Sequence, residues 1–185
     1  MIRYVATLAL VAVLAACSQQ KTEDQPAAPP ASDEVRTPAV APAVPAPVTA
    51  APNDSPTVGG DGSQITLSGL TQDDFAANKL EGELGCSFRA EGTDPLLYAL
   101  GYSGLKEAAH GLVKVGDYVE RIVAPGGYDA MVNGATFSGQ GKTIKIAITG
   151  KPAGGGESPA YPATLTYDRA DGAKRVIEGT WTCGP

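Results

Sequence analysis

The amino-acid sequence predicts an all-β fold, either a small β-barrel or a β-sandwich, with one or two short helices. In residues 143–149 (TIKIAIT), three isoleucines alternate with small or charged residues, which is the pattern of a half-buried strand. Two further alternating stretches, 161–167 and 174–183, flank the turn sequence DRADG at 168–172 and predict a C-terminal hairpin. Short strand patterns also recur along the chain with glycine-containing turns between them, as in sandwiches and barrels.

Other strands are expected before this hairpin. In chain order they cover residues 64–68, 84–90, 96–100, 111–115, 118–124 and 130–137. Two stretches favour a helix instead. Thr71 is a good N-cap residue, and the acids Asp73 and Asp74 suit the positive end of a helix that begins there. Residues 103–110 are expected to form one or two further helical turns.

The composition of the chain changes near residue 59. None of the 23 glycines precedes Gly59, whereas nine of the 15 prolines lie within residues 18–58. That proline-rich segment has no aromatic residue, and valine is its only large aliphatic residue, so it offers too little apolar surface to offset the entropy lost on ordering. We therefore expect a disordered, partly polyproline II tether up to residue 58 and one globular domain at 59–185.

The first 17 residues carry an export signal. Arg3 is followed by an apolar run over residues 4–16, which is too short to span a membrane but suits a secretory signal. The run ends in Leu14-Ala15-Ala16-Cys17, and in this motif the chain resembles bacterial lipoproteins. The resemblance implies that residues 1–16 are a signal peptide, that Cys17 receives lipid with acyl chains such as palmitate, and that the tether spans 17–58. An ordinary secretory signal ending at Ala16 is the alternative.

The residue after the cysteine bears on the location. In bacterial lipoproteins an aspartate at this position is the inner-membrane retention signal, and here it is Ser18. The resemblance therefore implies an outer-membrane lipoprotein whose domain lies in the periplasm, with the membrane as a partner through the lipid on Cys17. Two or three acyl chains hold a protein firmly, while one binds only marginally.

Two cysteines, Cys86 and Cys183, remain once the lipidated cysteine is set aside. Compartments outside the cytoplasm are oxidising, so these two are expected to form a disulfide. Each also falls on the apolar face of its predicted strand, Cys86 between Leu84 and Phe88, and Cys183 two residues after Trp181. Two free thiols are the alternative.

Several kinds of site lack the residues they need. The net charge of −6 argues against a nucleic-acid partner. One histidine and three distant cysteines exclude a zinc site, and no metal or cofactor is expected. Gly141-Lys142-Thr143 is similar to the end of a phosphate-binding loop, but the glycine required five residues earlier is Thr136, and a strand pattern follows where a helix is needed.

The sequence also lacks the residue patterns of known catalytic sites. His110, the only histidine, is expected on the surface near the end of the short helix at 103–110, and no serine lies in a Gly-x-Ser-x-Gly context. The acidic pairs Asp73/Asp74 and Glu81/Glu83 fit a helix start and a loop better than the two carboxylates of a glycosidase. The protein is therefore not expected to be an enzyme.

Tyrosines in glycine-rich turns are the best candidates for a contact surface. Tyr102 lies in Gly-Tyr-Ser-Gly at 101–104, and Tyr128 lies in Gly-Gly-Tyr-Asp at 126–129. Tyrosine is frequent at binding surfaces because its ring is amphipathic. We expect a binding or structural role, with an envelope protein or a glycan as the partner.

Two other hypotheses remain. The architecture, and the segment GATFSG at 134–139, are similar to small envelope lipoproteins that inhibit lysozyme, which are also lipidated β-barrels closed by a disulfide. A protruding loop would favour this inhibitor hypothesis, whereas a concave face lined by tyrosines would favour binding of another kind. The third hypothesis, a carboxylate-based hydrolase, requires two converging carboxylates, one with a raised pKa.

Overall fold

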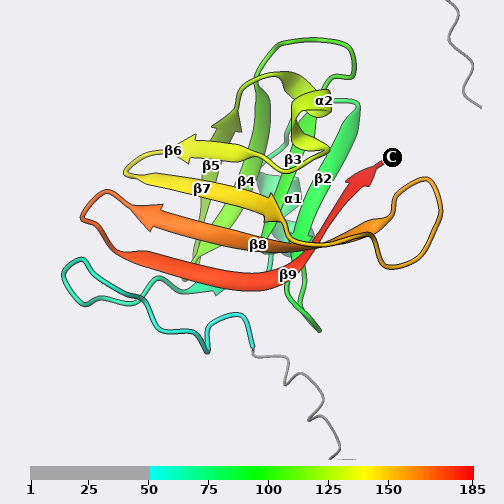
Figure 1. Ribbon diagram of the computed structural model, residues 1–185. Coiled ribbons are helices and arrows are strands. Elements are labelled where there is room, and N and C mark those ends of the chain that lie inside the picture. The colour runs from blue at the N-terminus through cyan, green and yellow to red at the C-terminus, as the bar shows by residue number, and fades with distance from the viewer. Residues whose placement is uncertain (1–50) are drawn as a thin grey trace, which may run out of the picture. The chain divides into compact units, whose positions relative to one another are not determined.

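The computed structural model describes residues 51–185, which form a closed antiparallel β-barrel of eight strands (Figure 1). A short additional strand and two short helices are attached to it. The elements are β1 (Leu67–Ser68), α1 (Gln72–Ala77), β2 (Leu84–Arg89), β3 (Leu97–Gly101), β4 (Ala109–Val115), β5 (Tyr118–Ala124), α2 (Gly127–Met131), β6 (Thr136–Gly139), β7 (Lys142–Ile148), β8 (Ala160–Arg169) and β9 (Lys174–Gly184). Neither helix is long and apolar enough to cross a membrane.

The barrel is a simple meander. Each strand from β2 to β9 pairs with the next one along the chain, and β9 returns to pair with β2. Strand β1 pairs with Lys114 and Val115 at the end of β4, beyond the residues of β4 that pair with β3. The prediction of an all-β fold is confirmed, and of the two predicted architectures the chain adopts the barrel.

The predicted disulfide between Cys86 and Cys183 is confirmed. The two cysteines are directly opposite each other in the register of β2 and β9, with Cα atoms 4.1 Å apart. This is close to the shorter of the two spacings found between antiparallel strands. The bond therefore joins the first and last strands of the barrel at the position where the ring closes.

The interior of the barrel is filled with side chains. Trp181, Phe88, Phe137 and Ile144 are completely buried, and the rings of Trp181 and Phe137 meet edge to face with centroids 6.4 Å apart. The alternation seen in the sequence is responsible, because it turns one apolar side chain inward at every second position of each strand. A small ligand would therefore have to bind outside the barrel.

The two ends of the barrel are covered by different segments. At one end, here called the α2 end, Met131 of α2 is fully buried and its carbonyl oxygen accepts a hydrogen bond of 2.9 Å from Trp181 Nε1. At the opposite end, here called the β1 end, Ile65 and Leu67 are buried in the core cluster. In Figure 1, α2 and residues 51–68 lie at opposite ends of the strands.

Residues 51–58 belong to the folded domain, although they were predicted to be part of the tether. The amide of Asn53 bonds to both the N–H and the C=O of Leu67, at 3.0 and 2.9 Å, and Val58 forms an isolated β-bridge with Lys174. Composition did not predict this because the segment binds through its backbone, the Asn53 amide and the Thr57 hydroxyl, and not through large buried apolar residues. The signal peptide, Cys17 and residues 18–50 of the tether lie outside the described residues.

Helix α1 lies at the predicted place, on the outer face of the barrel. Thr71 and Asp74 form a capping box, and the hydrogen bond from the Thr71 backbone lowers the pKa of Asp74. Asp74 also pairs with Lys114 of β4 at 3.0 Å. Leu70, just before α1, and Leu112 of β4 are buried as well, although neither belongs to the interior cluster.

Two element predictions were wrong. Residues 103–110 do not form a helix: residues 102–108 are an irregular loop, and β4 begins at Ala109. The predicted strand at 130–137 starts only at Thr136, because α2 occupies the first part of it. The helix begins at Gly127 after the N-cap Gly126, both of which have positive φ (66° and 89°), and hydrophobic alternation does not detect such a start. The first strand is also shorter than the predicted 64–68.

Candidate functional site

The structure brings together the two tyrosine-containing turns that the sequence singled out. The backbone N–H of Tyr128 donates a hydrogen bond to the carbonyl oxygen of Tyr102 at 3.2 Å. The backbone N–H of Gly104 donates to Asp129 Oδ2 at 2.8 Å. Both bonds join the loop of residues 102–108 to α2, so two loops from different parts of the meander form one surface. We call residues 102–108 together with α2 the α2-end surface.

Glycine is required where these two segments meet. Gly127 has a φ of 66°, and a Cβ there would collide with the carbonyl oxygen of Leu105 and lie 2.9 Å from that of Tyr102. A Cβ at Gly101 would lie 2.6 Å from the backbone nitrogen of Tyr128. The backbones can approach each other because neither position carries a side chain.

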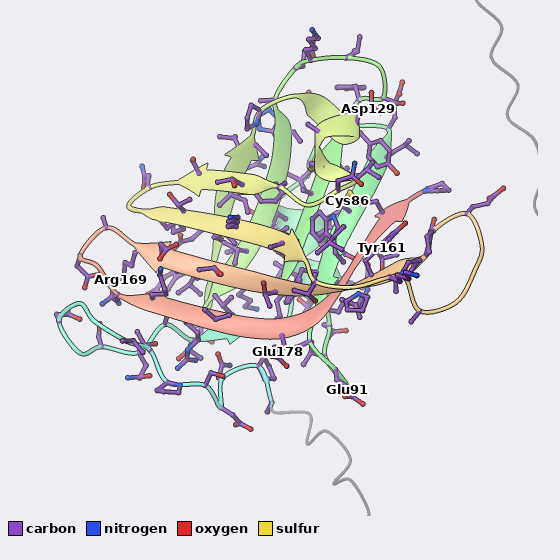
Figure 2. The ribbon with its side chains drawn as sticks, viewed as in Figure 1. Cys86, Glu91, Asp129, Tyr161, Arg169 and Glu178 are labelled. Carbon is purple, nitrogen blue, oxygen red and sulfur yellow. A yellow bond between two sulfur atoms is a disulfide. The ribbon has the colours of Figure 1, made fainter. Side chains whose placement is uncertain are left out.

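The exposed part of the α2-end surface differs from the predicted one. Tyr102 and Tyr128 are both half-buried, and Tyr128 packs against the core. Leu105 is 48% exposed in a loop whose neighbouring residues are also exposed. The loop projects beyond the strands in Figure 1, and Figure 2 shows Asp129 on α2 beside it. Leu105 was not predicted, because its only signal is a leucine beside a glycine in a stretch with no strand alternation.

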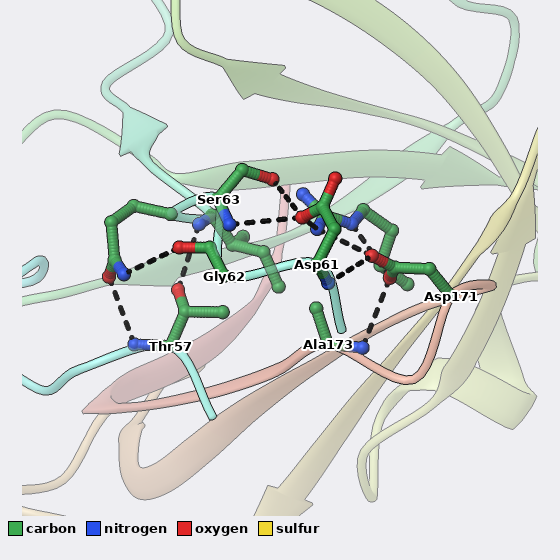
Figure 3. Close-up of polar contacts among 9 residues, drawn as sticks. Thr57, Asp61, Gly62, Ser63, Asp171 and Ala173 are labelled. Atoms are coloured by element: carbon green, nitrogen blue, oxygen red, sulfur yellow. Dashed lines mark hydrogen bonds and ion pairs between the residues drawn. The ribbon is translucent and has the colours of Figure 1, made fainter. Parts of the chain in front are cut away.

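At the β1 end, a polar network fastens residues 57–65 to the β8–β9 hairpin (Figure 3). Arg169 bonds to Asp171 through Nε and Nη2 at 2.8 and 2.7 Å, and to Asp61 at 2.8 Å. The hydrogen bond from Arg169 holds the pKa of Asp171 below its ordinary value, and bonds from Ser63 lower that of Asp61. Both carboxylates are thus engaged within the domain, which indicates a structural role.

Buried charges also lie inside the β1 end. Arg175 is 3% exposed and donates hydrogen bonds to the side-chain oxygens of Asn53 and Gln64 at 2.8 and 2.9 Å. Burial lowers the pKa of Arg175. The side chain of Lys142 is almost buried, forms an ion pair with Glu120, and has a pKa lowered by desolvation. As expected, Gly141-Lys142-Thr143 leads into a strand and not into a helix.

The remaining catalytic candidates are scattered. His110 is exposed on β4, where its cross-strand neighbours are Leu100 and Val123, so its predicted place at the end of a helix was wrong. Asp74 caps α1, as the sequence suggested. Residues 51–185 contain no group of three or more His, Cys, Asp or Glu side chains placed to hold a metal ion. Hydrogen bonds lower the pKa values of Asp61, Asp74 and Asp171, whereas the hydrolase hypothesis calls for a carboxyl whose pKa is raised.

The tyrosines do not form a concave face in the described part of the chain. Tyr167 is buried in the core, Tyr98 lies on the outer face of β3 against Phe75, and Tyr118 is 78% exposed at the start of β5. The projecting loop at the α2 end is therefore the feature that best fits a contact surface. No protein-family model, curated protein sequence or solved structure matches this chain.

Proposed function

We propose that this protein is a lipoprotein of the outer membrane, anchored through Cys17, whose barrel binds an envelope protein or glycan through the α2-end surface. The Leu-Ala-Ala-Cys motif at 14–17 and the serine after it support the anchor. The disulfide supports an oxidising compartment. The filled barrel interior supports binding on the outside of the domain.

The observation that carries the binding proposal is the fastening of residues 102–108 to α2. A loop held at Tyr102 and Gly104 by hydrogen bonds to α2 loses less conformational entropy on binding than a free loop does. Leu105, between the second of these bonds and Ala109 of β4, presents an apolar side chain to solvent. A rigid loop with an exposed apolar side chain at its centre is suited to bind a complementary surface.

The same loop favours a second candidate function, inhibition of an envelope glycosidase such as lysozyme. A loop that projects from a rigid barrel can enter the cleft of an enzyme, and residues 103–108 are all exposed. Both candidate functions would therefore use the α2-end surface. Inhibition of purified lysozyme by the protein separates the two.

Replacing Cys17 with serine tests the anchor. Serine has no thiol to accept diacylglycerol, so the Cys17→Ser protein should lose its acyl chains and leave the membrane fraction. Detergent phase partitioning measures this directly: the wild-type protein should enter the detergent phase and the variant the aqueous phase. A variant that remained with the detergent would contradict lipidation at this residue.

Replacing Leu105 with aspartate tests the surface. The full-length protein is used to capture partners from solubilised envelopes, and the recovered partner should fall at least about tenfold, which corresponds to about 1.4 kcal/mol. Val176→Asp is the matched control, because Val176 is 42% exposed on β9 and lies outside the α2-end surface. If the two variants recovered the partner equally well, the α2-end surface would not be the binding site. Loss of lysozyme inhibition in Leu105→Asp alone would establish the second candidate.

A further inference from the structure

A groove on the outer wall of the barrel shares no residue with the α2-end surface. It lies between α1, with the residues that follow it, and the outward faces of β2 and β3, and has a volume of about 540 Å³. Pockets that bind small molecules usually measure about 300–1,000 Å³. We call it the α1 groove.

One part of the α1 groove is apolar. Tyr98 and Leu100 face outward on β3, because Leu97, Ala99 and Gly101 are turned into the barrel. Phe75 of α1 meets Tyr98 edge to face, with centroids 5.3 Å apart and planes at 73°. Burial of the Tyr98 ring raises the pKa of its hydroxyl. Helix and strand together therefore hold a fixed aromatic and aliphatic surface for the body of a ligand.

Two positively charged side chains also line the groove. Lys79, after α1, and Arg89, at the end of β2, both line it, with the hydroxyl-bearing Ser87 also on its wall. No aspartate or glutamate lines the groove, although the chain as a whole has a net charge of −6. Within residues 51–185, neither Lys79 nor Arg89 takes part in a salt bridge. By contrast, Lys114, Lys142, Arg169 and Lys174 each have a carboxylate partner.

From this arrangement we propose that the α1 groove binds a small amphipathic anion, a carboxylate or phosphate attached to an apolar group. The apolar group lies on Phe75, Tyr98 and Leu100, and the acid group lies between Lys79 and Arg89. The planar guanidinium of Arg89 can bind two oxygens of a carboxylate or phosphate at once, and the ammonium of Lys79 adds a second charge. The complementary charge of the groove favours an anion over a neutral molecule of the same shape.

Nuclear magnetic resonance of the full chain carrying Cys17→Ser tests the proposal without detergent. The probes are octanoate and octyl phosphate, with octanol as the uncharged control and acetate as the control without an apolar body. We expect both anionic probes to shift the ring resonances of Phe75 and Tyr98 and the methyl resonances of Leu100, and octanol and acetate to bind at least tenfold more weakly. Comparison of the two anionic probes decides whether the site prefers carboxylate or phosphate.

Substitutions locate the charges. Arg89→Gln and Lys79→Gln should each weaken binding of the better anionic probe, about tenfold for Arg89→Gln, because hydrogen bonds to charged groups contribute more than neutral ones. Lys151→Gln is the control: it removes the same charge from an exposed position in the β7–β8 loop outside the groove and should leave binding unchanged. Both side chains are exposed, and Lys79→Gln gives a second readout if the Arg89→Gln protein were to unfold. Octanol binding as tightly as octanoate, probe shifts outside the groove, or equal weakening by Lys151→Gln would each overturn the proposal.

Discussion

Replacing both Cys86 and Cys183 with alanine should lower the free energy of unfolding by about 2–5 kcal/mol. This is a large part of the roughly 5–15 kcal/mol that stabilises a typical domain. The expected effect is large because the disulfide joins residues 97 positions apart and so restricts the unfolded chain strongly. Thermal and denaturant unfolding, followed by circular dichroism, should show a lower midpoint with unchanged strand content in the folded state.

Reduction of the wild-type protein provides the control. A reducing agent should bring the wild-type midpoint close to that of the Cys86→Ala/Cys183→Ala variant and leave the midpoint of the variant itself unchanged. Recovery of two alkylatable thiols from the folded, unreduced protein would contradict the bond. An unchanged midpoint in the double variant would contradict its contribution to stability.

Replacing Asn53 with alanine should destabilise the domain by about 2–4 kcal/mol. The Asn53 side chain satisfies both backbone groups of Leu67 and accepts a hydrogen bond from the buried Arg175. Within residues 51–185 the Nε atom of Arg175 has no partner, so loss of Asn53 would leave this guanidinium with Gln64 alone. Chemical denaturation measures the change, and Asn133→Ala, at an exposed asparagine, should alter stability by less than about 0.5 kcal/mol.

A second substitution separates the charge from the backbone contacts. Arg175→Met removes the buried charge but keeps an apolar side chain of similar length, and such replacements are often neutral or stabilising. The Asn53→Ala/Arg175→Met protein should therefore be more stable than Asn53→Ala alone. If the effects of the two substitutions on stability simply added, the burial of an unpaired guanidinium would not be the reason for the cost of Asn53→Ala.

The sequence predicted the strands well because each depends mainly on its own alternation. Strand β5 has the predicted bounds, Tyr118–Ala124, and β7 differs from the prediction by one residue at each end. The choice between barrel and sandwich could not be made, since it depends on whether β9 pairs with β2, a contact between distant parts of the chain. Helix α2 was not predicted because it starts at glycines with positive φ, and the pattern of hydrophobic residues does not indicate that backbone conformation.

The candidate sites were predicted only in part. Tyr102 and Tyr128 were identified separately from their glycine-rich turns, but the hydrogen bond between their backbones depends on the closed barrel. The α1 groove was missed because Arg89 and Lys79 look like ordinary surface charges until α1 packs on the outer wall. One signal was available: Leu112 occupies the outward phase of β4 between His110 and Lys114, and an apolar side chain there indicates a covered outer face.

The meander also determines the order in which the barrel can be completed. Every pairing in the ring except one joins consecutive strands, so these hairpins can form one after another as successive parts of the chain become available. The pairing of β2 with β9 must wait for the C-terminal residues, and until then both strands offer an unpaired edge to other chains. When an external oxidant takes two electrons from the Cys86 and Cys183 thiols, the disulfide fixes the pairing of β2 with β9 covalently, so its presence shows that a given molecule has closed its barrel.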